Sequence, residues 1–449
     1  MGTTTLKELM QNFSEQIGDY LTFATTDNIG AGTTVVSTDL QQYDGSGDDY
    51  FGDWWVYIDG TNNSGVLRQI VKVGGYATAT GTLTVRGANL SSESGSVTCY
   101  LHRYNRDFKK LAINRSIEQV YPLLHKRVND KTLVTGNLLF DGHFEDWTSS
   151  SALRFASGSS TTLVKTTTAG LHRGPLNTTS AKSTASGSNG YILFSSINNP
   201  RMKDIAGKSA SLEAWVYPQT ADDVTVILYT KNKAGTEQTK TSTTTAVASV
   251  WTKLKLLDQS INDDLTLVEV RLNVATSGQN AYWDDARLVA SETQEYLLPV
   301  DLRGGHVSQV NVQTWGEGDR VCDDVFSDFW DSQEFRTPDD GTYSYIRLNA
   351  LNGNWRRIEL IGYTPLSTMS SDTDSTEVSG ERENLLIAKA AVILYRLLRG
   401  PVSSEDVSSY TSEIRAWEIE YRSLSSRLGM TTPAETIYTG RHNRGSSWW

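Results

Sequence analysis

The sequence predicts a mostly β protein of the α+β class, with a small β-barrel or sandwich, a large inserted antiparallel sandwich and a two-helix C-terminal hairpin. Three observations predict this class. Short runs of β-branched and aromatic residues, separated by Gly, Asn and Asp, dominate residues 20–101 and 136–365. Helical periodicity is confined to residues 3–18, 107–128 and 381–429. A length of 449 residues allows about three domains.

Composition and charge exclude several functional classes. The chain has 41 Lys and Arg residues against 52 Asp and Glu residues, a net charge of −11, which argues against a surface built to bind nucleic acid. The most apolar segment, Leu385 to Leu398, is interrupted by Lys389 and Arg396, so we expect no membrane span. The N-terminal residues lack the layout of a secretory signal. The two cysteines, Cys99 and Cys322, are too far apart to indicate a disulfide framework, so we expect buried thiols in a protein that folds in a reducing compartment.

Residues 1–18 are expected to form an N-terminal helix. Thr5 and Glu8 fit a capping box at its start, and Gly18 follows its last turn. Its apolar residues recur at spacings of three and four: Leu6, Leu9, Met10, Phe13 and Ile17.

Residues 19–135 are expected to form the first half of a β-domain that carries one helix. Both alternating sets of side chains in Asp53–Ile58 are apolar, so this strand should be covered on both faces. A helix is expected over residues 107–128, with a kink or break at Pro122. The expected strands are Thr34–Ser37, Asp53–Ile58, Val66–Val73, Thr82–Val85 and Val97–Leu101.

Residues 136–294 are expected to form an inserted antiparallel sandwich, because strand patterns recur there at short intervals with polar loops and almost no helix. In residues 212–217, Leu, Ala and Val alternate with Glu213, Trp215 and Tyr217. Residues 295–365 are expected to complete the β-domain begun before the insertion, with a hairpin from Tyr343 to Ile361 that turns at Asn352-Gly353.

The C-terminal part is expected to be helical. Residues 366–380 form a polar linker, and residues 381–429 form two helices, Glu381–Leu398 and Glu405–Leu428. A seam of apolar residues along the second helix includes Trp417 and Tyr421, which are candidate partner-binding residues. Residues 430–449 are expected to be an arm whose end, Trp448 and Trp449, docks on a neighbouring subunit.

No catalytic motif supports an enzyme. The sequence has no HExxH, no Cys and His at zinc spacing and no GxSxG, and its six histidines are scattered. Pairs of adjacent Asp residues lie in turn-like contexts, which is typical of solvated loops. We therefore expect no catalytic residue and no required cofactor.

The ends of the insertion resemble carbohydrate-binding modules of the jelly-roll type. The resemblance lies in Asn137–Trp147 (NLLFDGHFEDW) and Tyr282–Leu288 (YWDDARL), which are similar to the first and last strands of those modules. It implies a jelly-roll sandwich and a structural calcium ion, for which Glu145 and Asp285 would be the ligands. A glycan would need exposed aromatic rings on one face. The aromatic residues available are Trp215, Tyr217, Tyr229, Trp251 and Trp283, and we take Trp215, Tyr217 and Trp251 as the candidates.

The remainder of the chain resembles neck proteins of tailed bacteriophages, of the head–tail connector or adaptor type. The residues that carry this resemblance are Asp53–Ile58, Gly65–Arg68, Lys110–Arg115, Ile358–Leu366 and the final helical hairpin. It implies a non-catalytic virion protein that is assembled in the host cytoplasm. It also implies a homo-oligomer, a dodecameric ring that contacts the portal protein and other tail or neck proteins while genome DNA passes nearby.

Three functions remain open from the sequence. The first is a structural subunit of the virion neck with an outward jelly-roll domain. The second is a glycan-binding tail or adhesion protein, in which the inserted sandwich is the functional part. The third is a glycan-degrading enzyme with an appended binding module.

Overall fold

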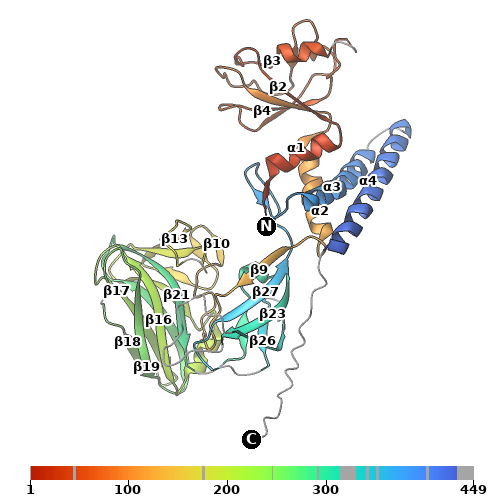
Figure 1. Cartoon of the computed structure of the whole chain (residues 1–449). Coiled ribbons are helices and arrows are strands. Elements are labelled where there is room, and N and C mark those ends of the chain that lie inside the picture. Colours follow the sequence, from red (N-terminus) through yellow and green to blue (C-terminus); the bar gives the residue numbers. More distant parts are fainter. Residues whose placement is uncertain are drawn as a thin grey trace. The chain divides into compact units, whose positions relative to one another are not determined.

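The computed structural model describes residues 2–43, 47–173, 177–244, 246–290, 293–313, 330–339, 343–349, 353–400 and 404–431, with only the backbone for 404–406 and 429–431. These residues form two compact units, which are described separately. Unit 1 comprises residues 2–126 and 365–431, and unit 2 comprises residues 127–364 (Figure 1). Trp448, Trp449 and almost all of the expected arm lie outside the described residues.

The N-terminal β region of unit 1 contains two antiparallel sheets around one apolar core. Val56 and Ile58 are fully buried in that core, whereas Tyr57 lies on the opposite face, where the Arg106 guanidinium is 3.9 Å from its ring centroid. The prediction that this strand is covered on both faces is therefore confirmed. In spatial order the strands are β2 (Tyr20–Ala24), β8 (Thr98–His102), β4 (Trp55–Asp59) and β5 (Val66–Gln69) in one sheet, and β3 (Thr34–Val36), β7 (Thr82–Thr84) and β6 (Tyr76–Ala77) in the other, with the 3-10 helix η1 (Thr38–Gln42) between β3 and β4.

The helices of unit 1 share a second core. They are α1 (Leu6–Gln16), α2 (Arg106–Val120), α3 (Glu381–Arg399) and α4 (Ser404–Thr431). The capping box predicted for α1 is present, since the Thr5 side chain accepts from the Glu8 backbone and Glu8 accepts from the Thr5 backbone. α2 ends at Val120 rather than continuing to residue 128, because the residue before Pro122 adopts an extended conformation.

The segment expected to be a polar linker, residues 366–380, packs against the helices instead. Leu366, Met369 and Val378 are buried in the helical core. The short strand β28 (Ser375–Thr376) pairs with β1 (Thr4–Thr5). The segment is thus held by buried apolar side chains and by polar contacts, among them two hydrogen bonds from the Arg106 guanidinium to the Asp372 carboxylate.

The first part of unit 2 is an antiparallel jelly-roll sandwich made of two five-stranded sheets among the described residues. We call them the β17 sheet and the β16 sheet. The β17 sheet has the order β12 (Ser157–Ser159), β15 (Gly190–Ser195), β20 (Leu265–Val274), β17 (Val224–Asn232) and β18 (Glu237–Thr241). The β16 sheet has the order β13 (Thr161–Thr166), β14 (Ser180–Ala185), β21 (Asn280–Val289), β16 (Ser209–Pro218) and β19 (Thr252–Ser260). A hairpin, β10 (Trp147–Ser149) with β11 (Ala152–Leu153), and the 3-10 helix η2 (Pro200–Ile205) accompany them.

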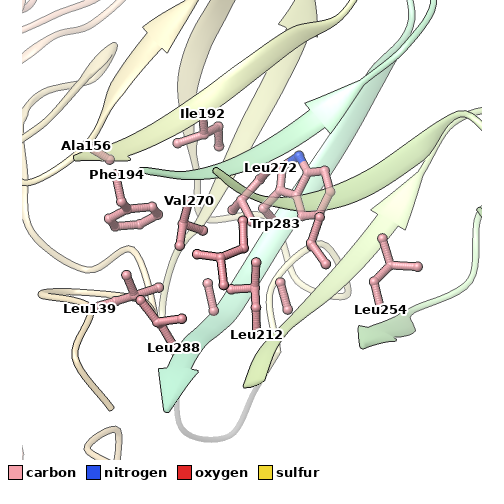
Figure 2. Packing of buried hydrophobic residues seen from close by; sticks show 14 of the residues in the cluster. Leu139, Ala156, Ile192, Phe194, Leu212, Leu254, Val270, Leu272, Trp283 and Leu288 are labelled. Atoms are coloured by element: carbon pink, nitrogen blue, oxygen red, sulfur yellow. The ribbon is translucent and has the colours of Figure 1, made fainter. Parts of the chain in front are cut away.

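The core of the sandwich lies between the two sheets (Figure 2). Trp283 is fully buried there, and its indole Nε1 donates a 3.0 Å hydrogen bond to Ser183 Oγ. Leu212 on β16 and Val270 and Leu272 on β20 are also fully buried (Figure 2). The alternation predicted along residues 212–217 is confirmed, because the aliphatic set faces this core and the other set faces away.

The two ends of the insertion meet on β21, although residues 137–146 form turns rather than a strand. Asn137 bridges to Val289, and the Leu138 amide donates to the Leu288 carbonyl at 2.9 Å. β21 itself is the central strand of the β16 sheet.

The strands that follow the sandwich do not complete the N-terminal β region, which differs from the prediction for residues 295–365. Among the described residues they pair with β9 and with one another, around a separate core that includes Val128, Val310 and Leu360. The predicted hairpin is also wrong, since β26 and β27 pair with different strands. The two sheets are β24 (Trp330–Ser332), β23 (His306–Gln313), β27 (Ile358–Thr364) and β9 (Lys126–Asp130), and β22 (Glu295–Leu297), β26 (Tyr345–Leu348) and β25 (Phe335–Arg336), with the 3-10 helix η3 (Val300–Leu302).

Within the described part of the chain, none of the helices has both the length and the apolar character required to cross a bilayer.

Candidate functional site

The face of the β16 sheet that points away from the core gathers aromatic side chains. We call it the outer face. Directly paired residues of antiparallel strands project their side chains to the same side of a sheet. Tyr217 on β16 pairs with Tyr282 on β21, and Tyr282 pairs with Lys182 on β14. Because Val216 and Trp283 point into the core, Tyr217 and Tyr282 must point outward.

Three of these rings form a contiguous aromatic cluster at one end of the outer face: Tyr217, Trp251 and Tyr282. The Tyr217 ring centroid lies 5.7 Å from that of Trp251 and 6.0 Å from that of Tyr282. Trp251 immediately precedes β19, and its Nε1 donates to the Gly170 carbonyl at 3.0 Å. All three rings are half-buried, so they are held in place and still offer part of their surface to solvent.

Trp215 lies on the same face, but a cation covers it. The guanidinium carbon of Arg173 is 3.6 Å from its ring centroid, and Lys253 Nζ is 5.3 Å from the centroid. The Trp215 Nε1 is buried and has no hydrogen-bond partner among the described residues. The prediction that Trp215 shares a face with Tyr217 is correct, and two cationic side chains lie against its ring.

Two buried carboxyl groups lie under the outer face beside Trp215. Asp284 is fully buried and accepts from the Arg173 amide at 2.8 Å, the Asn177 side chain at 2.5 Å and the Asp285 amide at 2.8 Å. Burial raises the pKa of Asp284 well above its ordinary value, although these donors oppose the shift. Glu213 is 1% exposed, and its carboxylate lies 3.6 Å from Lys253 Nζ without a hydrogen bond to any described residue.

Of the remaining aromatic residues considered from the sequence, Trp283 belongs to the core and Tyr229 to the other sheet. Tyr229 lies on β17, and the Arg271 guanidinium is 4.4 Å from its ring centroid. Tyr282 was missed as a candidate. The alternation of β21, in which a buried tryptophan follows it directly, could have identified it.

The two predicted calcium ligands have protein partners instead. Glu145 accepts hydrogen bonds from the Thr178 amide and hydroxyl, both at 2.5 Å, and from the Thr179 amide at 2.9 Å. Asp285 is paired with Arg287 and, at 3.4 Å, with Arg357. No group of three or more His, Cys, Asp or Glu side chains in the described residues is arranged to hold a metal ion. The calcium site stays a prediction without a supporting ligand set.

Asp285 lies in a charged network of unit 2 that is largely buried. Arg287 is 1% exposed, and its Nε donates to Asp285 at 2.9 Å. Burial alone would raise the pKa of Asp285, but the guanidinium groups of Arg287 and Arg357 outweigh it and hold the pKa well below its ordinary value. The two guanidinium groups therefore keep the Asp285 carboxylate ionised. The ion pair with Arg357 joins two residues that are distant in sequence.

A cavity in unit 2 lies between residues 132–143 and residues 293–303. Burial raises the pKa of Asp141 to about 7 and lowers that of His143 to about 4. The Asp141 carboxylate, however, accepts from the Glu145 and Asp146 amides at 2.9 and 3.0 Å, and Arg303 is paired with Asp146. Asp141 and Asp146 thus stabilise the turn at residues 141–146 through their own contacts. We therefore assign no binding role to the cavity.

Unit 1 has a smaller cavity and a buried charge network. Lys109 on α2 is fully buried, and its Nζ contacts Asp19 at 2.8 Å, Ser14 Oγ at 2.8 Å and His102 Nδ1 at 3.1 Å. Burial lowers the pKa of Lys109 to about 8, although Asp19 opposes the shift. The adjacent cavity is lined by Lys7, Met10, Gln11, Tyr20, Tyr57, Tyr100, His102 and Arg106.

The predicted partner-binding residues of the hairpin lie largely within it. Trp417 and Tyr421 are partly buried and pack on the helical core, and Lys389 Nζ on α3 is 5.1 Å from the Tyr421 ring centroid. α3 and α4 lie side by side (Figure 1). The apolar seam predicted along the second helix therefore packs α4 against α3.

Comparisons with known proteins identify no family for this chain. No protein-family model matches it, and no curated protein matches it. Among solved structures, it is similar to the C-terminal family 22 carbohydrate-binding module of Clostridium thermocellum Xyn10B, with 14% identity over 31% of this chain and 87% of that chain and a TM-score of 0.26.

Two further solved structures are similar over about a third of the chain. One is TmCBM61 in complex with β-1,4-galactotriose, with 13% identity over 34% of this chain and 99% of that chain and a TM-score of 0.25. The other is the enzymatically active domain of bacteriophage CBA120 tailspike protein 4, with 11% identity over 36% of this chain and 21% of that chain and a TM-score of 0.25. At these values the likeness carries no argument about what this chain binds.

Proposed function

We propose that the sandwich of unit 2 is a non-catalytic glycan-binding module, and that the outer face of the β16 sheet is its binding surface. The observation that carries this proposal is the aromatic cluster of Tyr217, Trp251 and Tyr282. The C–H groups on one face of a pyranose ring stack on a flat π surface, and half-exposed rings provide that surface.

The position of the cluster supports a binding role. Tyr217 and Tyr282 lie on two paired strands, β16 and β21, and Trp251 is held by its bond to Gly170. Rings fixed by a sheet and by a hydrogen bond lose little conformational entropy when a ligand binds. The neighbouring Glu213 carboxylate and Trp215 Nε1 are buried without hydrogen-bond partners among the described residues.

Replacement of Tyr217 tests this proposal. We expect Tyr217→Ala to weaken binding to a responsive polysaccharide by about tenfold or more, because it removes the central ring of the cluster. The responsive polysaccharide is first found on a glycan array, and the affinity is then measured by affinity electrophoresis and calorimetry. The matched control is Tyr229→Ala, which removes a half-buried tyrosine from the other sheet and should leave the affinity unchanged.

Thermal unfolding by circular dichroism shows whether the Tyr217→Ala sandwich still folds. Equal affinities for wild type, Tyr217→Ala and Trp251→Ala, all folded, would place the glycan elsewhere. If the protein binds no glycan on the array, the proposed function is wrong.

We also propose a virion location, with unit 1 as the part that assembles into a ring with portal, tail or other neck proteins. The observation that favours assembly is a pair of exposed apolar side chains three residues apart on one face of α2: Phe108 is 47% exposed and Leu111 40%. The mass of the protein in solution and electron micrographs would test it. A ring supports this role, whereas a monomer at micromolar concentrations that also fails to join purified portal would exclude it.

A further inference from the structure

We infer that the ligand of the outer face is an acidic glycan, a polysaccharide that carries carboxylate or sulfate groups. This inference rests on the proposed glycan-binding function and names the class of glycan. It is drawn from the charges on the outer face, which are independent of the aromatic cluster.

Lysine side chains lie along both sides of the aromatic residues. On one side, Lys182 on β14 pairs with Tyr282, and its Nζ is 5.7 Å from the Tyr282 ring centroid. On the other side, β19 supplies Lys253, which pairs with Trp215, and Lys255, which pairs with Glu213. The register therefore places three ammonium groups on the same face as the rings.

Two of these lysines have no ion-pair partner within the described ranges. Lys255 is exposed and Lys182 is half-buried, and neither is bonded to a described carboxylate. Lys253 is paired with Glu213 at 3.6 Å. A lysine that lies beside an aromatic ring and lacks a carboxylate can form a charge-assisted hydrogen bond with an anion that is stacked on that ring.

The two acidic groups beside Trp215 are withdrawn from the surface, whereas Asp258, near the end of β19, is exposed. Glu213 is 1% exposed and Asp284 is fully buried, and Asp284 is surrounded by three hydrogen-bond donors. The guanidinium of Arg173 adds a further positive charge above Trp215. Around Trp215 the outer face thus presents cations and hides carboxylates, in a chain whose net charge is −11. Since charges separated by more than about 10 Å are largely screened at 0.1 M salt, the local cations decide which ligand is attracted.

Single-stranded nucleic acid also combines anionic groups with rings that stack, so it is an outcome of the test. The observations favour the glycan, because few cations are present and the chain as a whole is acidic, whereas nucleic-acid surfaces are extensively basic.

The experiment compares defined ligands on the full-length protein. Hyaluronan and heparin represent carboxylated and sulfated glycans, xylan and galactan represent neutral glycans, and a poly-dT oligonucleotide represents nucleic acid. Affinities are measured by calorimetry and affinity electrophoresis at low and high salt. The variant is Lys182→Gln with Lys255→Gln, and the matched control is Lys203→Gln, an exposed lysine in η2 of the same sandwich.

We expect an acidic glycan to bind at least about tenfold more tightly than either neutral glycan at low salt, with an affinity that falls as salt rises. The double variant should lose about fivefold to tenfold in affinity for the acidic glycan, and Lys203→Gln should lose none. Circular dichroism verifies that the variant is folded.

Equal binding of neutral and acidic glycans, unaffected by the two lysine substitutions, would overturn this inference and leave the proposed function intact. Binding of poly-dT without any glycan would overturn both, and so would the absence of binding to every ligand tested.

Discussion

Asp285→Asn is expected to lower the free energy of unfolding of unit 2 by about 3 kcal/mol, because it removes the buried negative charge that faces the guanidinium groups of Arg287 and Arg357. Arg287 is 1% exposed and Arg357 is 4% exposed, so neither guanidinium can recover its hydration in the folded state. Asparagine is chosen because Asp285 has a φ of +50°, a conformation that asparagine tolerates. Chemical denaturation followed by circular dichroism measures the effect.

Asp222→Asn is the matched control. Asp222 also has a positive φ, of +55°, but its side chain is exposed in the turn between β16 and β17. We expect a change of less than about 0.5 kcal/mol there. A similar loss for both variants would show that the backbone conformation, and not the buried pair, is responsible.

The pH dependence of this effect has a definite sign. The folded state holds the pKa of Asp285 below its ordinary value, so the stability it contributes is present above the unfolded value of about 3.9 and is lost as the pH falls below it. The difference between wild type and Asp285→Asn should therefore be largest near neutral pH and shrink in acid. A change in this difference in the free energy of unfolding when calcium is added would support the predicted calcium site at Asp285.

Lys109→Met is expected to destabilise unit 1 by about 3 to 5 kcal/mol, because it leaves the buried Asp19 without its partner. Asp19 is 1% exposed and lies 2.8 Å from Lys109 Nζ. The double variant Asp19→Leu with Lys109→Met should recover most of that loss, since both charges and both desolvation penalties are then removed. Chemical denaturation gives the free energies of unfolding of the wild type, the two single variants and the double variant, and these four values form a thermodynamic cycle.

Arg115→Ala on the same helix is the control, because Arg115 is exposed and should contribute less than about 0.5 kcal/mol. Additive losses in the double variant would contradict a direct interaction between Lys109 and Asp19. Binding of glycans should be unaffected by any of these unit 1 variants, because the outer face belongs to unit 2.

Local sequence patterns predicted the parts of the candidate site that lie on one strand. The alternation of β16 correctly placed Trp215 and Tyr217 on the face opposite Leu212, Ala214 and Val216. The capping box of α1 and the two helices of the hairpin were predicted for the same reason. Hydrophobic periodicity and helix capping depend on residues within a few positions of one another, so the sequence alone predicts them.

Pairing between distant strands could not be read in this way. The Asn352-Gly353 signal suggested a hairpin, but β27 pairs with β9 and β23, whose apolar faces share its core. Trp417 packs against the helical core while it stays partly exposed, and its expected contact with a partner stays a prediction. Tertiary burial outweighs local turn preference wherever another segment offers more apolar surface.

The sequence by itself determined most of the helices and which side chains of β16 face the same way, because the periods of 3.6 and 2 belong to the local backbone. Only the tertiary structure decided that Tyr217 contacts both Trp251 and Tyr282, that Arg173 covers Trp215, and that Asp285 contacts Arg287 and Arg357. These contacts join residues that are far apart in sequence. Their register is set by how the two sheets bury a common core, which no local pattern records.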